Sequence, residues 1–199
     1  MASPSLVLAS RSPRRIDLLS EWGVSALTHP ADIDETFEEV DDPAVWARTL
    51  AERKATVVRD RFRQDDSLPE VQWVLGADTV VSVEGELYGK PSDAASAVAT
   101  LEQLSGRHDI LVATGVALLE IGGDTRWVES DCSQVVMKPF SLPVIKAYVE
   151  TGEPFGKAGA FAVQGKGAQL VERVEGSFSN VVGLPRSLVE SLLARAGIL

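Results

Sequence analysis

The sequence predicts an α/β protein with a mixed, twisted β-sheet and flanking helices, for three reasons. The apolar run SLVLA at residues 5–9 leads straight into a helical segment, which is the strand-to-helix order of parallel sheets. Two later segments read as β-hairpins, one turning in EGE at 84–86 and one at Gly122 and Gly123. Because both kinds of connection occur in one chain, the sheet is expected to be mixed rather than purely parallel.

Helices are predicted where apolar residues recur at three- and four-residue spacing. The first begins at Ser12, a favourable N-cap, has Pro13 in its first position and stops at Gly23. A long helix follows Asp42, which can cap it, and extends to about residue 62. Shorter helices are expected at 92–106, capped by Ser92 and closed by Gly106, and at 141–152 and 184–198; further strands are expected at 71–91, 109–137 and 169–176.

The length and composition suit either one well-buried core or two lobes folded around a cleft, and we expect a single domain over residues 1–199. Acidic residues outnumber basic ones by 29 to 19, and the net charge of −10 argues against a nucleic-acid partner. There is neither a signal peptide nor a long apolar run, so we expect no membrane partner and a cytoplasmic location. The single cysteine, Cys132, excludes an internal disulfide, and its place in a predicted strand favours a small buried residue over a nucleophile.

The first helix carries an unusual pair of charges. Arg14 and Arg15 lie in its first turn, where the helix dipole already places partial positive charge, so the pair is unfavourable unless an anion binds there. Free N–H groups and the hydroxyls of Ser10 and Ser12 complete a receptor for phosphate. The alternative is that the arginines simply reach into solvent.

Carboxylates occur at two places that could face such an anion. In ADIDETF, residues 31–37, Asp34 and Glu35 of an extended segment would point to opposite faces, so at most one enters a given cleft; a solvated acidic loop is the alternative. Asp78 follows an apolar run and Gly76, which we interpret as a strand end, where open α/β sheets bind ligands. There Asp78 could bind a metal or act as a general base, or it could only stabilise a turn.

Lysines supply further positive charge. Lys54 lies on the apolar stripe of the long helix, where it either faces a ligand or reaches past the helix to water. Lys90 stands between a glycine and a proline that fix its loop. Lys157 and Gln164 lie in the glycine-rich segment 156–168, whose small residues would let a ligand approach the backbone closely.

These features converge on one ligand class. Two arginines and up to three lysines can neutralise a triphosphate, and carboxylates among them are explained by a divalent cation that bridges the same phosphates. Histidine chemistry is poorly supported, because the chain has only His29 and His108.

Seven motifs resemble those of the Maf family of nucleotide pyrophosphatases. In chain order they are LASRSPRR (8–15), DIDET (32–36), LAERKA (50–55), LGADTVV (75–81), GKP (89–91), KAGAFAVQG (157–165) and VVGLP (181–185). The ordered set spans nearly the whole chain. The resemblance implies an elongated fold of the inosine-triphosphate-pyrophosphatase type with two lobes around a deep cleft, a homodimer, and hydrolysis of a nucleoside triphosphate to the monophosphate and pyrophosphate.

The resemblance also assigns roles to the matching positions. Glu35 and Asp78 would be the acidic pair that holds Mg²⁺ or Mn²⁺, and Asp78 would accept the proton of the attacking water. The residues around the nucleotide and its phosphates would be Ser10, Ser12, Arg14, Arg15, Lys54 and Lys90. Arg15, Lys54 and Lys90 would stabilise the charge that develops on the departing pyrophosphate.

Substrate choice within the family tracks three positions, which here are Arg14, Thr79 and Gln164. This combination resembles the branch that acts on dTTP and UTP, because the branch acting on 7-methyl-GTP typically has tryptophan, glutamine and glutamate there. A glutamine can donate and accept hydrogen bonds, so Gln164 could recognise the edge of a pyrimidine.

Other functions stay open. The chain could be a nucleotide-binding regulator of cell division and septum formation with little catalysis, although carboxylates beside phosphates are hard to explain without a metal. It could be a broader house-cleaning enzyme for modified pyrimidine nucleotides or 7-methyl-GTP. RSPRR alone would suit a nucleic-acid-binding module, which the net charge disfavours.

Overall fold

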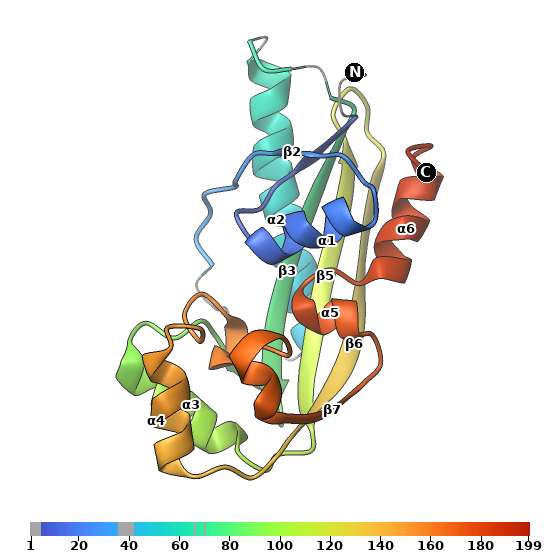
Figure 1. Cartoon of the computed structure of the whole chain (residues 1–199). Helices are drawn as coiled ribbons and strands as arrows, with labels where there is room; N and C mark the ends of the chain where they lie inside the picture. Colours follow the sequence, from blue (N-terminus) through green and yellow to red (C-terminus); the bar gives the residue numbers. More distant parts are fainter. Residues whose placement is uncertain (1–4, 36–41, 66, 70) are drawn as a thin grey trace.

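The computed structural model describes residues 5–35, 42–65, 67–69 and 71–199, which form one seven-stranded sheet with helices on both faces (Figure 1). The strand order is β2-β1-β3-β5-β6-β7, with the short β4 paired to β3. β2, β1 and β3 pair in parallel, while β3, β5, β6 and β7 pair antiparallel, so the predicted mixed sheet is confirmed. The strands are β1 Leu6–Leu8, β2 Leu27–Thr28, β3 Trp73–Val83, β4 Glu86–Tyr88, β5 Ile110–Glu120, β6 Arg126–Met137 and β7 Val171–Glu175.

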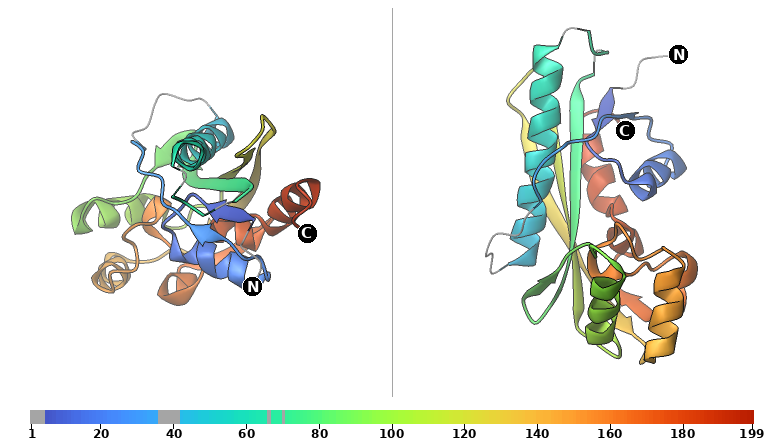
Figure 2. Two further views of the ribbon diagram at one scale, coloured as in Figure 1. Left: turned by 90° about the horizontal axis from the view of Figure 1, so that it is seen from above. Right: turned by 90° about the vertical axis from the view of Figure 1, so that its left-hand side faces the viewer.

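The two faces of the sheet are covered differently. Among the helices of the described residues, α2 alone covers one face, and the others cover the second face, with α1 and α6 toward one end and α3 and α4 toward the other (Figure 2, right). The larger apolar core lies on this second face, and two smaller clusters lie under α2. The helices are α1 Pro13–Glu21, α2 Pro43–Gln64, α3 Ala94–Leu104, α4 Leu142–Glu150, α5 Phe178–Val182 and α6 Arg186–Arg195, with 3₁₀ turns η1 Ala158–Ala160 and η2 Gly165–Gln169.

α2 lies unusually close to the sheet because glycines face it. A Cβ on Gly76 of β3 would lie 2.2 Å from the Ala51 carbonyl oxygen, and one on Gly115 of β5 would lie 2.2 Å from that of Ala47. Real Cβ atoms do not come so near, so only glycine permits this approach. The close packing brings the middle of α2, including Lys54, directly over β3.

One edge of β3 is bare at its centre. β1 pairs with residues 73–75 and β4 with residues 81–83, whereas β5 covers the opposite edge along residues 73–82. Of the strands in the described ranges, none therefore covers residues 76–80 on the first edge. This gap opens at the C-terminal end of β1, where the chain turns into α1. In parallel pairs such strand ends are where ligands bind.

The prediction that Asp78 ends a strand is wrong, because β3 runs unbroken from Trp73 to Val83. The strand that ends near Asp78 is the neighbouring β1. Gly76 was interpreted as a break, but its role is to admit α2. The segment at 29–35 is also not a strand, so the alternation expected for Asp34 and Glu35 does not apply.

Two local predictions need correction, and two short elements were missed. Cys132 is exposed on β6 rather than buried. Asp93, not Ser92, caps α3. The Asp93 carboxylate accepts the backbone N–H of Ser96 at 2.7 Å, and the backbone N–H of Asp93 donates to the Ser96 hydroxyl. Neither β2 nor α5 was expected, since both are too short to show a period. Within the described parts of the chain, no helix has the length and apolar character needed to cross a membrane.

Candidate active site

A cleft of about 880 Å³ opens at the bare edge of β3. Its walls come from the start of α1, the loop before Glu35, α2, β3, the η1–η2 segment and the end of α5. Every site residue predicted from the sequence lines it: Ser10, Ser12, Arg14, Arg15, Glu35, Lys54, Asp78, Thr79, Lys90 and Gln164. The bare edge explains how neighbouring residues of one strand, Asp78 and Thr79, both reach the cleft although their side chains leave opposite faces of the sheet.

Alternating cations and carboxylates cross one end of the cleft. Lys54 Nζ donates to Asp78 Oδ1 at 2.5 Å and lies 2.6 Å from Glu35 Oε1. Lys90 Nζ in turn donates to Glu35 Oε2 at 2.5 Å. Lys54 and Asp78 are each 6% exposed, so Lys54 does not reach past the helix to bulk water. These four residues form an ion-paired network that joins α2, β3 and the loops holding Glu35 and Lys90.

The two lysines keep Glu35 ionised. Burial by itself raises the pKa of Glu35, but hydrogen bonds and charge from Lys54 and Lys90 outweigh it and lower the pKa to about 2. Glu35 is therefore a carboxylate at any physiological pH. Asp34, its neighbour, does not line the cleft.

Arg15 is a buried cation that three segments of the chain hold in place. It is 8% exposed, and its guanidinium donates to the Gly183 carbonyl at 2.9 Å, to Ser10 Oγ at 3.2 Å and to Thr79 Oγ1 at 3.1 Å. Burial lowers the pKa of Arg15, although nearby carboxylates counteract it. Three separate segments thus fix this charge in one orientation, as a preorganised phosphate partner requires.

Thr79 belongs to the same network. Its hydroxyl also lies 3.0 Å from that of Thr114 on β5, and Thr114 donates to the Asn180 carbonyl of α5 at 2.9 Å. The residue linked by resemblance to substrate choice therefore contacts Arg15.

Arg14 lies on the wall of the cleft, near Tyr148 and Glu153. Its Nε is buried and has no hydrogen-bond partner within the described residues. Burial lowers the pKa of Arg14, and the nearby Tyr148 and Glu153 only partly offset this. A buried polar atom without a partner is costly, so this part of the cleft is suited to a ligand that offers an acceptor.

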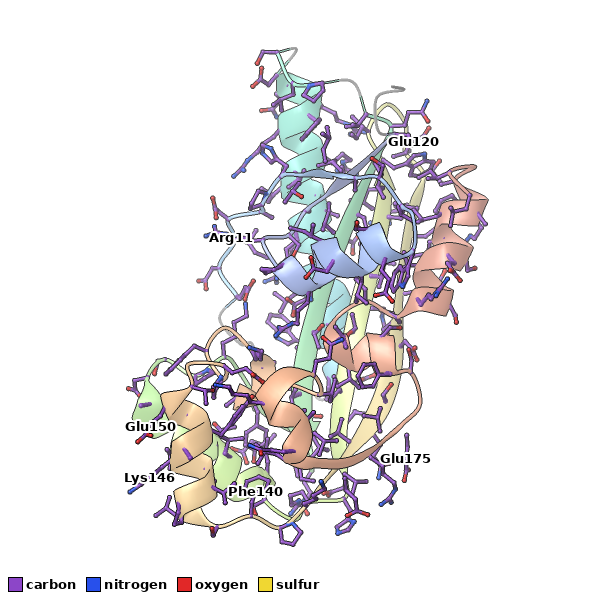
Figure 3. All side chains as sticks on the ribbon, viewed as in Figure 1. Arg11, Glu120, Phe140, Lys146, Glu150 and Glu175 are labelled. Carbon is purple, nitrogen blue, oxygen red and sulfur yellow. The ribbon has the colours of Figure 1, made fainter. Side chains whose placement is uncertain are left out.

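Gln164 is exposed immediately before η2 and also lines the cleft. Lys157, also on the wall, donates its Nζ to the Glu153 carbonyl. Arg11, in the loop ahead of α1, lies at the rim (Figure 3) and forms an exposed ion pair with Asp32.

Sequence reasoning missed Glu153. Its carboxylate lines the cleft and accepts three hydrogen bonds, from Tyr148, Lys166 and Gly167. The one local signal is its position between Gly152 and Pro154, which reads as an ordinary turn. Its partners Lys166 and Gly167 come later in the chain, so no short sequence motif predicts the role of Glu153.

The acidic pair suits a divalent cation that arrives with its ligand. The described residues contain no cluster of three or more metal-ligating side chains. Glu35 and Asp78 nevertheless approach one common atom, Lys54 Nζ. Mg²⁺ in nucleotide sites commonly takes one or two carboxylates and completes its shell with phosphate and water, which matches this donor set.

Comparison with known proteins identifies the family. The model of Maf-like proteins matches residues 5–196. The chain belongs to the Maf family. A Maf relative from Geobacter sulfurreducens, named dTTP/UTP pyrophosphatase, is 42% identical over the whole of both chains. Another of the same name, from Myxococcus xanthus, is 45% identical and covers 97% of this chain and 93% of its own.

Two further matches to this Maf chain have other names. A nucleoside triphosphate pyrophosphatase from Nostoc punctiforme is 38% identical over 99% of this chain and 96% of its own. A solved structure of a nucleoside-triphosphatase / dITP/XTP pyrophosphatase from Mycobacterium abscessus covers 98% of this chain and 97% of its own, with a TM-score of 0.42 and 14% identity. At that distance it adds nothing to what the sheet itself shows.

Proposed function

We propose that this Maf chain hydrolyses nucleoside triphosphates, with dTTP and UTP preferred, to the monophosphate and pyrophosphate. One observation carries the proposal: the ion-paired network of Lys54, Asp78, Glu35 and Lys90 shares a single cleft with Arg14 and Gln164. A cleft with charge at one end and adaptable polar groups at the other suits a molecule with a polyanionic tail and a neutral head. The names of the full-length relatives point to the same reaction.

The charged end is where the triphosphate binds. Arg15, Lys54 and Lys90 point into it from three different segments, and Arg15 is fixed before any ligand arrives. Cations held in place cost little reorganisation when charge moves toward the leaving group, which is the main electrostatic contribution to phosphoryl chemistry.

Glu35 and Asp78 would hold Mg²⁺ or Mn²⁺ at this end. When bound, the cation neutralises phosphate charge and helps to fix the phosphates in place. A ligand bearing phosphates also gives Lys54 and Lys90 new anionic partners, so the carboxylates can exchange part of their ion pairing for the cation.

Asp78 is the proton acceptor of the proposed reaction. A water attacks the α-phosphorus, a new oxygen–phosphorus bond forms, and the bond from the α-phosphorus to the oxygen bridging to the β-phosphorus breaks. Pyrophosphate leaves with the electron pair of that bond. Asp78 takes the proton of the water on one carboxylate oxygen, which leaves the other, Oδ1, for its cationic partner, Lys54 or the metal ion.

The base binds at the other end, near Gln164 and Arg14. An amide presents both a donor and an acceptor, as the edge of thymine or uracil does, so Gln164 can match it with paired hydrogen bonds. Arg14, whose buried Nε has no partner among the described residues, supplies a donor for a base or sugar oxygen.

The test is product analysis on a panel of dTTP, UTP, CTP, GTP, ITP and 7-methyl-GTP with Mg²⁺ or Mn²⁺. We expect pyrophosphate and monophosphate in equal amounts, fastest from dTTP and UTP. Release of orthophosphate would place the attack on the γ-phosphorus and overturn the reaction proposed. Tight binding of all six without turnover would favour a nucleotide-binding regulator.

A further inference from the structure

Glu153 sits where α4 ends and the wall of the base end begins. Its Oε1 accepts the Tyr148 hydroxyl at 3.1 Å and the backbone N–H of Gly167 at 2.9 Å. Its Oε2 accepts the backbone N–H of Lys166 at 2.9 Å. One carboxylate thus joins α4 to the first turn of η2, which begins immediately after Gln164.

The first turn of η2 packs closely around this carboxylate and Tyr148. Gly165 has a positive φ of 64°, and a Cβ there would lie 2.9 Å from Glu153 Oε2. A Cβ on Gly167 would lie 2.5 Å from the Ala162 carbonyl oxygen and 2.6 Å from the Tyr148 hydroxyl. Gly165 and Gly167, which both follow Gln164, are therefore packed against Glu153 and its partner Tyr148.

The charges near Glu153 are consistent with a fixed anion. Burial by itself raises its pKa, but the backbone N–H groups of Gly167 and Lys166 outweigh this and lower it. Arg14 and Lys157 lie on the same side of the cleft, and the negative charge of Glu153 raises the pKa of each against the opposing effect of burial.

We propose that Glu153 is a positioning residue for base selection: its carboxylate holds the turn that carries Gln164 and so fixes the amide at the angle a pyrimidine needs. This inference rests on the proposed function, because it assumes that the base lies against Gln164. Glu153 acts through the turn, so its loss should affect recognition of the base more than recognition of the phosphates.

Glu153→Gln tests the proposal with almost no change of shape. An amide can present its oxygen to Gly167 and Tyr148 or to Lys166, but then its NH₂ group meets an N–H donor at the other site. Tyr148→Phe is the second, milder variant, because it removes only the hydroxyl that donates to Glu153. Glu150 is an exposed carboxylate on α4 (Figure 3), and Glu150→Gln is the matched control.

Each variant is characterised in three assays. Steady-state kinetics give kcat and KM for dTTP and CTP, and binding in metal-free buffer gives the dissociation constants of both nucleotides. The third assay measures inhibition by inorganic tripolyphosphate, which has no base. For Glu153→Gln we expect KM and Kd for dTTP to rise about tenfold, as loss of one or two hydrogen bonds implies, and the preference for dTTP over CTP to fall similarly. Tripolyphosphate inhibition should change less than about twofold. Tyr148→Phe should shift the same quantities in the same direction by less, and Glu150→Gln should leave them unchanged.

Other outcomes overturn the inference in distinguishable ways. A preference for dTTP that survives both Glu153→Gln and Tyr148→Phe removes Glu153 from base selection. A parallel weakening of dTTP and tripolyphosphate means that Glu153 supports the whole cleft rather than the base end. If the wild type turns over none of these nucleotides, the proposed function fails, and the dissociation constants still decide whether Glu153 controls selection of the base.

Discussion

Lys54 Nζ lies 2.5 Å from Asp78 Oδ1, although one residue belongs to a helix and the other to the middle of a strand. Helix and sheet are normally separated by a layer of side chains, and a lysine in such an interface would have no short route to the strand. Here α2 approaches so closely over Gly76 and Gly115 that the ammonium reaches the strand directly. The ion pair at the centre of the site is thus a consequence of backbone packing.

Asp78→Asn is expected to abolish most turnover while leaving the fold intact. The amide keeps the shape and can still accept from Lys54, but it cannot take a proton from water, so kcat should fall by about 10²-fold or more. Steady-state kinetics with dTTP, together with thermal unfolding, measure both effects. Asp17→Asn on the exposed side of α1 is the matched control. A kcat close to that of the wild type would exclude Asp78 as the proton acceptor.

Lys54→Met is expected to destabilise the protein more than a loss of packing would. Asp78 would be left buried without its cation, which in buried pairs costs about 3 kcal/mol or more. Unfolding in urea measures the free energy of unfolding of the wild type and of each variant. The double variant Lys54→Met with Asp78→Asn should recover part of the loss, since no unpaired charge remains at that position. If Lys54→Met and the double variant are equally stable, the loss of stability does not come from the unpaired charge of Asp78.

The sequence predicted those elements whose pattern is local and long. The stripe of α2 repeats over many turns, and both hairpins have clear turns, so their positions agree with the structure. The errors came from features whose cause lies elsewhere in the chain. Gly76 has the appearance of a strand break in one dimension, and only the presence of α2 above it reveals why the position is a glycine.

The same distinction separates the predicted parts of the site from the missed ones. Arg14 and Arg15 could be recognised as site residues from the sequence, because two cations in the first turn of a helix are unfavourable with respect to the helix dipole. The partner that fixes Arg15, the carbonyl of Gly183, is 168 residues away and leaves no mark near the helix. Glu153 looks like a turn residue until η2 is folded onto it.

Gly76→Ala is expected to destabilise the fold and weaken catalysis together. The new methyl group would lie 2.2 Å from the Ala51 carbonyl oxygen and 2.8 Å from Ala55 Cβ, so α2 must move outward and Lys54 with it. Overpacking of this kind costs about 1–3 kcal/mol, and at such a contact more. Chemical denaturation and kcat/KM are the measurements. Gly122→Ala is the control, since nothing lies within 4 Å of its Cβ; equal effects of the two changes would refute close packing of α2 as the cause.

Removal of divalent metal is expected to stop turnover without unfolding the protein. The carboxylates proposed as metal ligands are ion-paired with Lys54 and Lys90 in the chain alone, so the fold does not depend on the cation to neutralise them. Treatment with EDTA should reduce dTTP hydrolysis to background while the unfolding midpoint stays unchanged, and added Mg²⁺ or Mn²⁺ should restore the rate. Full activity in the chelator would remove the metal from the mechanism, and a large drop in the midpoint would mean that the ion pairs do not hold the site together.

Gln164→Glu is expected to reduce the use of dTTP and UTP. An ionised glutamate can only accept hydrogen bonds, so it cannot match a pyrimidine edge that needs both a donor and an acceptor. It also places a second negative charge on the turn held by Glu153. We expect kcat/KM for dTTP to fall about tenfold or more, with KM rising, while inhibition by tripolyphosphate weakens much less. Gln169→Glu, exposed at the far end of η2, adds the same charge outside the cleft and should leave kcat/KM unchanged. If the two variants behave alike, the base does not lie against Gln164, and the assignment of the two ends of the cleft must be reversed or abandoned.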